Sequence, residues 1–288
     1  MFLRFPGSLP GYHPRQSLVV GQIPYALFVL EKSEGQKSVF LTEHTLLFVR
    51  RGHKRLHFTD DVLTVDKDHL VFLKRGLYTM SEYVPEGETF EALLLFISDA
   101  FLQQFALSQE LPRGPVAAAA THVVVPATAL LESFAAQYAS YFGHSAQALQ
   151  YILALKVQEL FLLLLASGAA AQLREFVQAL AHNSPVDLDL IVRQHVFQPV
   201  TIPELARLAG RSLASFRREF ESRYHMPPHQ WISAQRLRQA RLLVHTTPKS
   251  IAEIADACGY ESVSHFIRRY KQEFGLTPAS SRSEKAMN

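Results

Sequence analysis

The sequence is poor in cysteine and has no long uninterrupted apolar run. Its single cysteine, Cys258, excludes an intramolecular disulfide and a cysteine-based zinc site. The most apolar stretch, residues 149–165, is interrupted by Gln150, Lys156, Gln158 and Glu159, which predicts a buried helix rather than a membrane span. The N-terminus lacks the apolar segment and cleavage pattern of a signal peptide. These absences predict a cytoplasmic protein that makes no membrane contact.

Common catalytic motifs are absent as well. The sequence contains no Gly-x-Ser-x-Gly elbow, no phosphate-binding loop and no dinucleotide-binding fingerprint. We therefore predict a protein that is not an enzyme and that needs no cofactor.

The net charge is small, and it is unevenly distributed along the chain. Over all 288 residues it amounts to +3. Residues 183–288 hold 15 Lys and Arg against 10 Asp and Glu, a balance of +5, whereas residues 1–182 hold 14 against 16, a balance of −2. The length and the 48% content of hydrophobic residues suffice for two globular domains. A basic C-terminal part agrees with binding to nucleic acid, although many ordinary domains carry as much charge.

The sequence does contain an internal repeat. Residues 201–228 and residues 250–278 share one pattern, with one extra residue in the second copy. An internal repeat fixes the architecture before any motif is interpreted. The paired positions include Thr201 with Ser250, Glu204 with Glu253, Gly210 with Gly259, Ser212 with Ser262, Phe216 with Phe266 and Phe220 with Tyr270.

Each copy has the local signals of a helix, a tight turn and a second helix. A hydroxyl residue followed three positions later by Glu is a capping box, which satisfies free amides at a helix start. Gly210 and Gly259 can adopt the left-handed conformation that a turn after a helix requires. A serine then caps the second helix of each copy, which we place at residues 213–222 and 263–273. The repeat therefore predicts two helix-turn-helix units.

The second helix of each copy has an apolar face and a polar face. Aromatic residues four positions apart are expected to dock on the first helix of the unit. The opposite face carries arginines, which suit bidentate contact with guanine or phosphate. One such helix could equally be a solvated charged surface, but two equivalent helices in tandem favour DNA. The predicted DNA-binding residues are Leu213, Ala214, Arg217, Arg218, Ser264, His265, Ile267, Arg268, Arg269 and Lys271.

The C-terminal hundred residues resemble the DNA-binding domain of the AraC/XylS transcription regulators. Ordered matches carry the resemblance, among them Leu205-Ala206, Gly210, Phe216, Pro228, Trp231, Arg236, Ala240, Ile254-Ala255, Gly259-Tyr260, Phe266, Phe274-Gly275 and Thr277-Pro278. The resemblance implies two helix-turn-helix units joined by a long helix, which we place at residues 229–245. It also implies double-stranded DNA and RNA polymerase as partners, and activation of transcription.

The chain departs from the family pattern at three positions. His225 stands where Gly is usual, Tyr270 replaces Phe, and Ser281 replaces an aromatic residue. A residue other than Gly in the turn after the first recognition helix costs energy. We interpret the other two departures as packing variants.

The N-terminal part changes its pattern near residue 98. Before it, eight short apolar runs separated by turn signals predict strands, and many short strands favour a barrel or jelly roll. Beyond it, helices are predicted over residues 99–108, 127–142, 146–167 and 170–182. Residues 1–20 are interpreted as a loosely held arm and residues 182–185 as a linker.

The predicted fold is therefore multidomain, with α and β parts. A barrel followed by helices, in front of this DNA-binding domain, is similar to the cupin-type regulatory domain of the family. We assign residues 1–182 to a cupin-like β-barrel with a helical dimerisation segment. Residues 183–288 form the all-α domain with two helix-turn-helix units.

Short blocks at residues 46–52, 101–105 and 155–162 resemble, more narrowly, the activators of bacterial type III secretion of the exoenzyme S regulator type. This resemblance implies control by a regulatory protein and a homodimer formed through helices within residues 127–167. The alternative is a small effector inside the barrel. The apolar interior expected there could equally be a filled core, and its residues are Phe28, Phe40, Phe48, Phe58 and Phe72.

Thirteen histidines leave a metal-dependent enzyme fused to a DNA-binding tail as the weakest alternative. His53 and His57 lie four positions apart, with His44 and His69 nearby. The sequence lacks the His-x-His pair of a metal cupin, and the basic residues within 50–55 disfavour a cation. We therefore predict histidines that pack or lie at the surface, and no metal.

Overall fold

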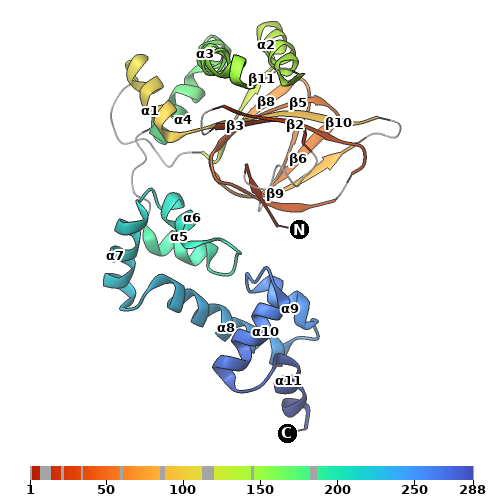
Figure 1. Cartoon of the computed structure of the whole chain (residues 1–288), viewed down its shortest axis with the longest axis vertical. Coiled ribbons are helices and arrows are strands. Elements are labelled where there is room, and N and C mark those ends of the chain that lie inside the picture. Colours follow the sequence, from red (N-terminus) through yellow and green to blue (C-terminus); the bar gives the residue numbers. More distant parts are fainter. Residues whose placement is uncertain are drawn as a thin grey trace. The chain divides into compact units, whose positions relative to one another are not determined.

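The computed structural model describes residues 2–6, 14–20, 23–33, 35–58, 61–84, 88–111, 120–143, 146–181 and 187–287. The chain divides into two compact units, Met1–Asn183 and Ser184–Asn288 (Figure 1). The linker predicted at residues 182–185 lies outside the described residues. Of the helices in the described ranges, none has the length and apolar character that crossing a bilayer requires.

The first unit contains two β-sheets whose strands are antiparallel except for one parallel pair, β1 with β4. The smaller sheet has the strand order β1 (Phe2–Phe5), β4 (Lys37–Leu41), β9 (Gly76–Tyr83), β6 (His53–His57) and β7 (Val62–Val65). The larger sheet has the order β11 (His122–Pro126), β8 (His69–Leu73), β5 (His44–Arg51), β10 (Phe90–Ile97), β3 (Ile23–Leu30) and β2 (Pro14–Val20).

The eight strands predicted before residue 98 are confirmed as β3 to β10. The interpretation of residues 1–20 as a loosely held arm is wrong, because β1 pairs with β4 and β2 pairs with β3. Strand β11 also has no counterpart in the prediction. All three additional strands lie at an edge of their sheet. An edge strand is paired on one side only and can lack a strong apolar pattern of its own. For β1 and β11 the partner is also distant in sequence, whereas β2 pairs with the next strand, β3.

The two sheets face each other across an apolar core (Figure 1). Alternate strand residues point into this core, for example Leu47 and Val49 of β5, together with Phe28 and Phe90, whose ring centroids are 6.2 Å apart. A cavity of only about 10 Å³ is left between the sheets. The predicted cupin-like β domain is confirmed. In the described residues its two facing sheets stay separate and do not close into one continuous barrel.

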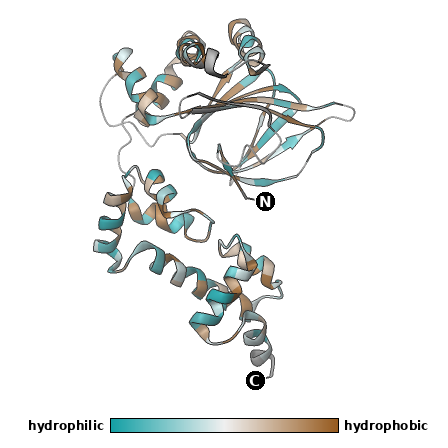
Figure 2. Ribbon diagram, in the orientation of Figure 1, coloured by the Kyte–Doolittle hydropathy of each residue, from teal (hydrophilic) through white to brown (hydrophobic). Residues whose placement is uncertain are grey.

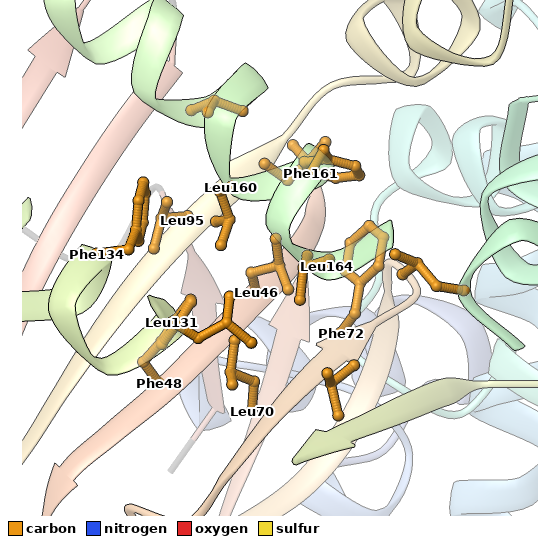
Figure 3. Close-up of a cluster of buried hydrophobic side chains, with 14 of the residues drawn as sticks. Leu46, Phe48, Leu70, Phe72, Leu95, Leu131, Phe134, Leu160, Phe161 and Leu164 are labelled. Carbon is orange, nitrogen blue, oxygen red and sulfur yellow. The ribbon is translucent and has the colours of Figure 1, made fainter. Parts of the chain in front are cut away.

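Helices cover the outer face of the larger sheet. They are α1 (Asp99–Ser108), α2 (Ala129–Ser140), α3 (Ala146–Leu165) and α4 (Ala170–Ala181), which confirms the four helices predicted there. Figure 3 shows the apolar cluster between sheet and helices, in which Phe72 of β8 lies beside Phe161 of α3. The ring of Phe72 is 5.7 Å from that of Phe161 and 5.2 Å from that of Phe176.

The assignment of Phe40, Phe48 and Phe72 to the barrel interior is wrong. Phe28 does lie there, and the half-buried Phe58 packs against the same cluster. Phe48 and Phe72 belong to the cluster beneath the helices (Figure 3). Phe40 lies between two interior residues of β4, so its buried side chain points to the other face. The central strands are buried on both faces and read as continuous apolar runs (brown in Figure 2), so alternation cannot show which residue faces which side.

The second unit is entirely helical. It contains α5 (Leu188–His195), α6 (Ile202–Leu208), α7 (Leu213–Tyr224), α8 (Pro228–Thr246), α9 (Ile251–Ala257), α10 (Val263–Phe274) and α11 (Pro278–Met287). The pairs α6–α7 and α9–α10 are the two predicted helix-turn-helix units, and α8 is the predicted connecting helix (Figure 1).

Candidate nucleic-acid interface

The first helix of each unit starts at a capping box, as the sequence predicts. The amide of Thr201 donates to Glu204 Oε2 at 2.6 Å, and the amide of Glu204 donates to Thr201 Oγ1 at 3.4 Å. Ser250 and Glu253 make the same reciprocal pair at 2.7 and 3.2 Å. The hydrogen bonds from Ser250 lower the pKa of the Glu253 carboxyl. Both first helices therefore begin at positions fixed by local sequence.

The turn of each unit sets where its second helix begins and in which direction it runs. Gly210 and Gly259 have φ values of +68° and +77°, in the left-handed region that glycine adopts without steric cost. Two residues later in copy one, Ser212 Oγ accepts from the amide of Ser215 at 3.2 Å. In copy two, Ser262 Oγ accepts from the amide of His265 at 3.3 Å. Helices α7 and α10 thus start just after equivalent serines.

Aromatic side chains anchor the inner face of each second helix. Phe216 and Phe220 of α7 are fully buried, and the ring of Phe220 packs edge-on against Trp231 of α8 at 5.8 Å. Phe266 and Tyr270 of α10 are equally buried in a cluster with residues of α8 and α9. Because the inner face is held in this way, the opposite face of each helix is fixed outward.

The outward faces carry most of the predicted DNA-binding residues. Ala214, Arg217 and Arg218 of α7 are exposed, as are Ser264, His265, Arg268 and Lys271 of α10. Figure 2 shows hydrophilic residues along both helices. Ala214 and Arg218 occupy the positions of Ser264 and Arg268, so the two surfaces correspond residue by residue. Glu221 was not among the predicted residues. It is exposed one turn beyond Arg218 and matches Lys271, so its spacing along the helix places it on the same outward face.

The outward basic residues contrast with other arginines of this unit. Within residues 187–287, Arg217, Arg218, Arg268 and Lys271 form no ion pair with an acidic side chain. Arg211, in contrast, holds Glu219 through two hydrogen bonds of 2.6 and 2.8 Å. A surface guanidinium without a carboxylate partner can take up a phosphate or a guanine edge without first breaking an ion pair.

Three predicted residues are placed less openly. Leu213 is half-buried at the start of α7, and Ile267 packs partly against the core of the second unit. Arg269 is also half-buried, since its Nη2 donates to Ser233 Oγ on α8 at 3.2 Å and its Nη1 donates to Gln272 Oε1 at 2.7 Å. The side chain of Arg269 therefore lies along α10 towards α8.

The departure at His225 has the backbone cost that the sequence suggests. His225 ends α7 with φ +55°, and the equivalent Gly275 ends α10 with φ +79°. The left-handed conformation costs an L-residue about 1–2 kcal/mol, which glycine avoids.

The departures at Tyr270 and Ser281 are coupled to each other. The hydroxyl of Tyr270 donates to Ser281 Oγ at 3.2 Å, and Ser281 Oγ lies 3.2 Å from Nε2 of His245 on α8. Tyr270 is fully buried, so an added hydroxyl there requires a polar neighbour. The small Ser281 both makes room for that hydroxyl and receives its hydrogen bond.

The histidines of the first unit have other partners. His53 stacks on Tyr83, and His57 Nε2 lies 2.8 Å from Ser81 Oγ. His44 is buried, with Nε2 3.0 Å from Asp99 Oδ1. Burial lowers the pKa of His44. In the part of the chain that the structure describes, three or more His, Cys, Asp or Glu side chains do not gather into a metal-binding group.

Both units of the chain are similar to known protein families. Residues 44–176 match the model of the ExsA N-terminal regulatory domain, and residues 205–284 match a helix-turn-helix domain model. The chain belongs to the AraC/XylS family of transcription regulators. Members of this family bind DNA, and the matched residues 205–284 contain both helix-turn-helix units of this chain.

Two proteins similar in sequence and one solved structure illustrate what the chain resembles. The transcriptional regulator ExsA of Pseudomonas aeruginosa is 27% identical over 250 residues, covering 84% of this chain and 87% of ExsA. The virulence regulon transcriptional activator VirF of Yersinia enterocolitica is 34% identical over 134 residues, or 46% of this chain and 48% of VirF. Fatty acid-bound ToxT from Vibrio cholerae aligns in structure over 90% of this chain and 94% of its own, at 15% identity and a TM-score of 0.40.

Proposed function

We propose that this AraC/XylS protein is a sequence-specific activator of bacterial promoters that reads two successive major grooves with α7 and α10. The observation that carries the proposal is the duplicated unit, with equivalent outward arginines on two helices of the same construction. Successive major grooves on one face of duplex DNA are about 34 Å apart. Two recognition helices on one connecting helix suit such a pair of grooves.

The proposal gives each predicted residue a role. Arg217, Arg218 and Arg268 contact base edges or the phosphates beside them, because the guanidinium fork matches guanine and phosphate. Arg269 and Lys271 contact phosphates. The remaining residues shape apolar and hydroxyl contacts, and they are Leu213, Ala214, Ser264, His265 and Ile267. No catalytic step and no cofactor belongs to this proposal.

Selection from random DNA tests the function directly. The full chain is mixed with a pool of duplexes that contain a randomised central segment, and bound duplexes are amplified over several rounds. We expect enrichment of one sequence made of two half-sites whose centres lie about 10–10.5 base pairs apart. Failure to enrich any sequence, even at low salt where phosphate contacts are strongest, contradicts the proposal.

We further propose that the controlled promoters belong to virulence genes, type III secretion genes among them. Support comes from the similarity to ExsA over most of the chain and from the regulatory-domain match in the first unit. The activator contacts RNA polymerase beside the promoter, following the habit of the family. This places the protein in the bacterial cytoplasm, on the nucleoid when bound.

Helix α3 supports the proposal of a homodimer formed through the first unit. Its outer face exposes Tyr151, Leu155 and Leu162, with exposed fractions of 76%, 66% and 46%. Leu130 of α2 is 63% exposed. Large apolar side chains gathered on one helix face mark a protein interface more often than a surface meant for water.

Substitution Leu155→Glu is expected to convert the dimer into folded monomers. A carboxylate buried without a partner at an interface costs about 3–5 kcal/mol, or more than a hundredfold in dimer affinity. Sedimentation over a range of protein concentrations measures this change. Gln172→Glu is the matched control, because it adds the same charge to an exposed polar position of α4, outside the proposed interface. A wild-type chain that sediments as a monomer at every concentration would remove the dimer from the proposal.

Control by a regulatory protein fits the first unit better than an effector inside the barrel. The cavity between the sheets, about 10 Å³, has room for about one water molecule. Buried Lys54 and Lys37 both donate to Glu82, so these polar groups of the first unit already bind one another.

A small effector remains the second candidate, on one specific observation. A cavity of about 250 Å³ lies between β5, β8 and α2, with apolar walls from Phe48, Leu70 and Leu131 and with Arg50 and Lys67 among its lining. A thermal-shift screen of metabolites separates the two candidates. Stabilisation by one compound favours an effector, whereas a co-expressed protein that binds the first unit favours a protein regulator.

A further inference from the structure

One arginine joins the α5–α6 connection to the turn of the second helix-turn-helix unit through backbone atoms. Arg236 lies in the middle of α8, and its Nε donates to the carbonyl oxygen of Val196 at 2.7 Å. Its Nη1 donates to the carbonyl oxygen of Gly259 at 2.9 Å, and its Nη2 donates to that of Gln198. Val196 and Gln198 follow α5 in the first half of the unit, whereas Gly259 lies in the turn of the second helix-turn-helix.

The three acceptors are the carbonyls at or just beyond helix ends. Val196 is the C-cap of α5, and Gly259 follows Cys258, the C-cap of α9. The last carbonyls of a helix have no partner within it, and they form the negative end of the helix dipole. One guanidinium therefore satisfies two helix ends, one from each half. A lysine has a single nitrogen in place of this fork and cannot hold the same three acceptors in one plane.

The main chain of the two halves also meets directly beside Arg236. A Cβ atom at Gly259 would lie 2.9 Å from both the carbonyl carbon and the carbonyl oxygen of Phe197. Real Cβ contacts are not that short, so the turn of the second unit approaches the α5–α6 connection as closely as only glycine permits. Arg236 and Gly259 thus act at the same junction.

A junction of this kind is needed if two helices are to read DNA as a pair. A helix of 19 residues such as α8 is about 28 Å long and can bend over that length. Each inserted base pair turns the second groove by about 35° about the DNA axis, so small changes between α7 and α10 spoil simultaneous binding. The contacts of Arg236 and Gly259 hold the α5–α6 connection against the turn between α9 and α10, and these contacts would resist such bending.

We infer that Arg236 is a positioning residue that fixes α7 relative to α10 and thereby sets the spacing of DNA half-sites that the protein accepts. The inference deepens the DNA-binding function proposed above and rests on it for its consequence at DNA. The fixed geometry itself can be measured without DNA.

The first experiment measures the distance between the recognition helices. Spin labels are attached at Glu221→Cys and Glu273→Cys, which are exposed positions on α7 and α10. Cys258 is fully buried, and burial raises the pKa of its thiol to about 11, so it reacts slowly with the label. Labelled full-length chain is diluted with unlabelled chain, so that only distances within one copy are recorded.

We expect one narrow distance distribution for the wild type and a broad one for Arg236→Ala. Arg238→Ala is the matched control, because Arg238 is an exposed arginine on the same helix, and it should keep the narrow distribution. An equally narrow distribution for Arg236→Ala overturns the inference. If circular dichroism shows that Arg236→Ala has lost its helices, Arg236→Lys decides, since it keeps the charge and most of the stem but loses the fork.

The second experiment measures spacing on duplexes selected by the wild type. Insertion of one or two base pairs between the half-sites should weaken wild-type binding at least about tenfold, because the second helix no longer benefits from the first. Arg236→Ala should bind the selected spacing about tenfold more weakly but lose only about twofold more on insertion. An equal loss at every spacing means that Arg236 affects affinity without setting spacing. If the wild type selects no duplex, the proposed function fails, and the distance measurement still decides the geometry.

Discussion

Replacing Arg218 and Arg268 together by alanine is expected to weaken binding to the selected duplex by roughly 10²–10⁴-fold. The two arginines occupy equivalent outward positions of α7 and α10 and are both exposed. A good bidentate contact to a base contributes about 1–3 kcal/mol, and distant sites contribute independently. Each single variant should therefore lose about one to two orders of magnitude. Fluorescence anisotropy with labelled duplexes, at one stated salt concentration, measures the affinity of the wild type, of each single variant and of the double variant.

The specificity of the loss decides which atoms of the DNA the arginines contact. If Arg218 reads a base, Arg218→Ala should lose affinity for the selected duplex and also relax the preference at one position. A loss that is equal on all sequences, with a shallower salt dependence, would instead assign a phosphate contact. Arg238→Ala serves as the control here as well, since Arg238 is exposed on α8 and outside the recognition helices. Unchanged binding by the double variant contradicts the assignment of this surface to DNA.

Substitution Phe72→Ala is expected to destabilise the first unit by about 3–5 kcal/mol, the usual cost of removing a buried aromatic side chain. Phe72 is fully buried, and its ring contacts Phe161 of α3 (Figure 3). The ring also contacts Phe176 of α4, so the change removes packing between the larger sheet and two helices at once. Urea unfolding followed by far-ultraviolet circular dichroism measures the free energy of unfolding. Helices α3 and α4 should unfold more easily, because they lose part of their packing against the larger sheet.

An exposed residue of the same helical layer provides the control. Leu107 of α1 is 60% exposed, so Leu107→Ala should change the free energy of unfolding by less than about 0.5 kcal/mol. A loss below about 1 kcal/mol for Phe72→Ala would show that the ring does not hold the helices to the sheet. That result would also contradict the placement of Phe72 on the face of β8 that is turned towards the helices.

The helix-turn-helix units were predictable because their signals are local. The capping box at Thr201 and Glu204 forms within three residues, and the left-handed turn at Gly210 depends on that residue alone. The same holds for the second copy. Burial of the aromatic face then leaves one possible outward face, so the arginines of α7 and α10 could be identified without coordinates.

The faces of the barrel strands were not predictable in the same way. In β5, the run Leu46 to Val49 is apolar at every position, because the inner core and the helices bury both faces. A one-residue shift would look the same in sequence. The edge strands β1 and β11 escaped prediction because they pair with strands far along the chain, β4 and β8. Strand β2 pairs with β3, the next strand in sequence, and it was missed because its Pro and Gly surroundings suggested an unstructured arm.

The duplication, the caps, the turns and the outward arginines all follow from the order of the residues, and so does the membership in a family of DNA-binding regulators. Three features become visible only in the folded chain: Phe72 faces the helices, Tyr270 and Ser281 compensate each other, and Arg236 joins both halves of the second unit. Local features depend on residues within one helical turn, which a sequence displays. The three other features depend on contacts between residues from different helices and strands. Such contacts form only when the elements pack together, and the periodicity of the sequence does not show them.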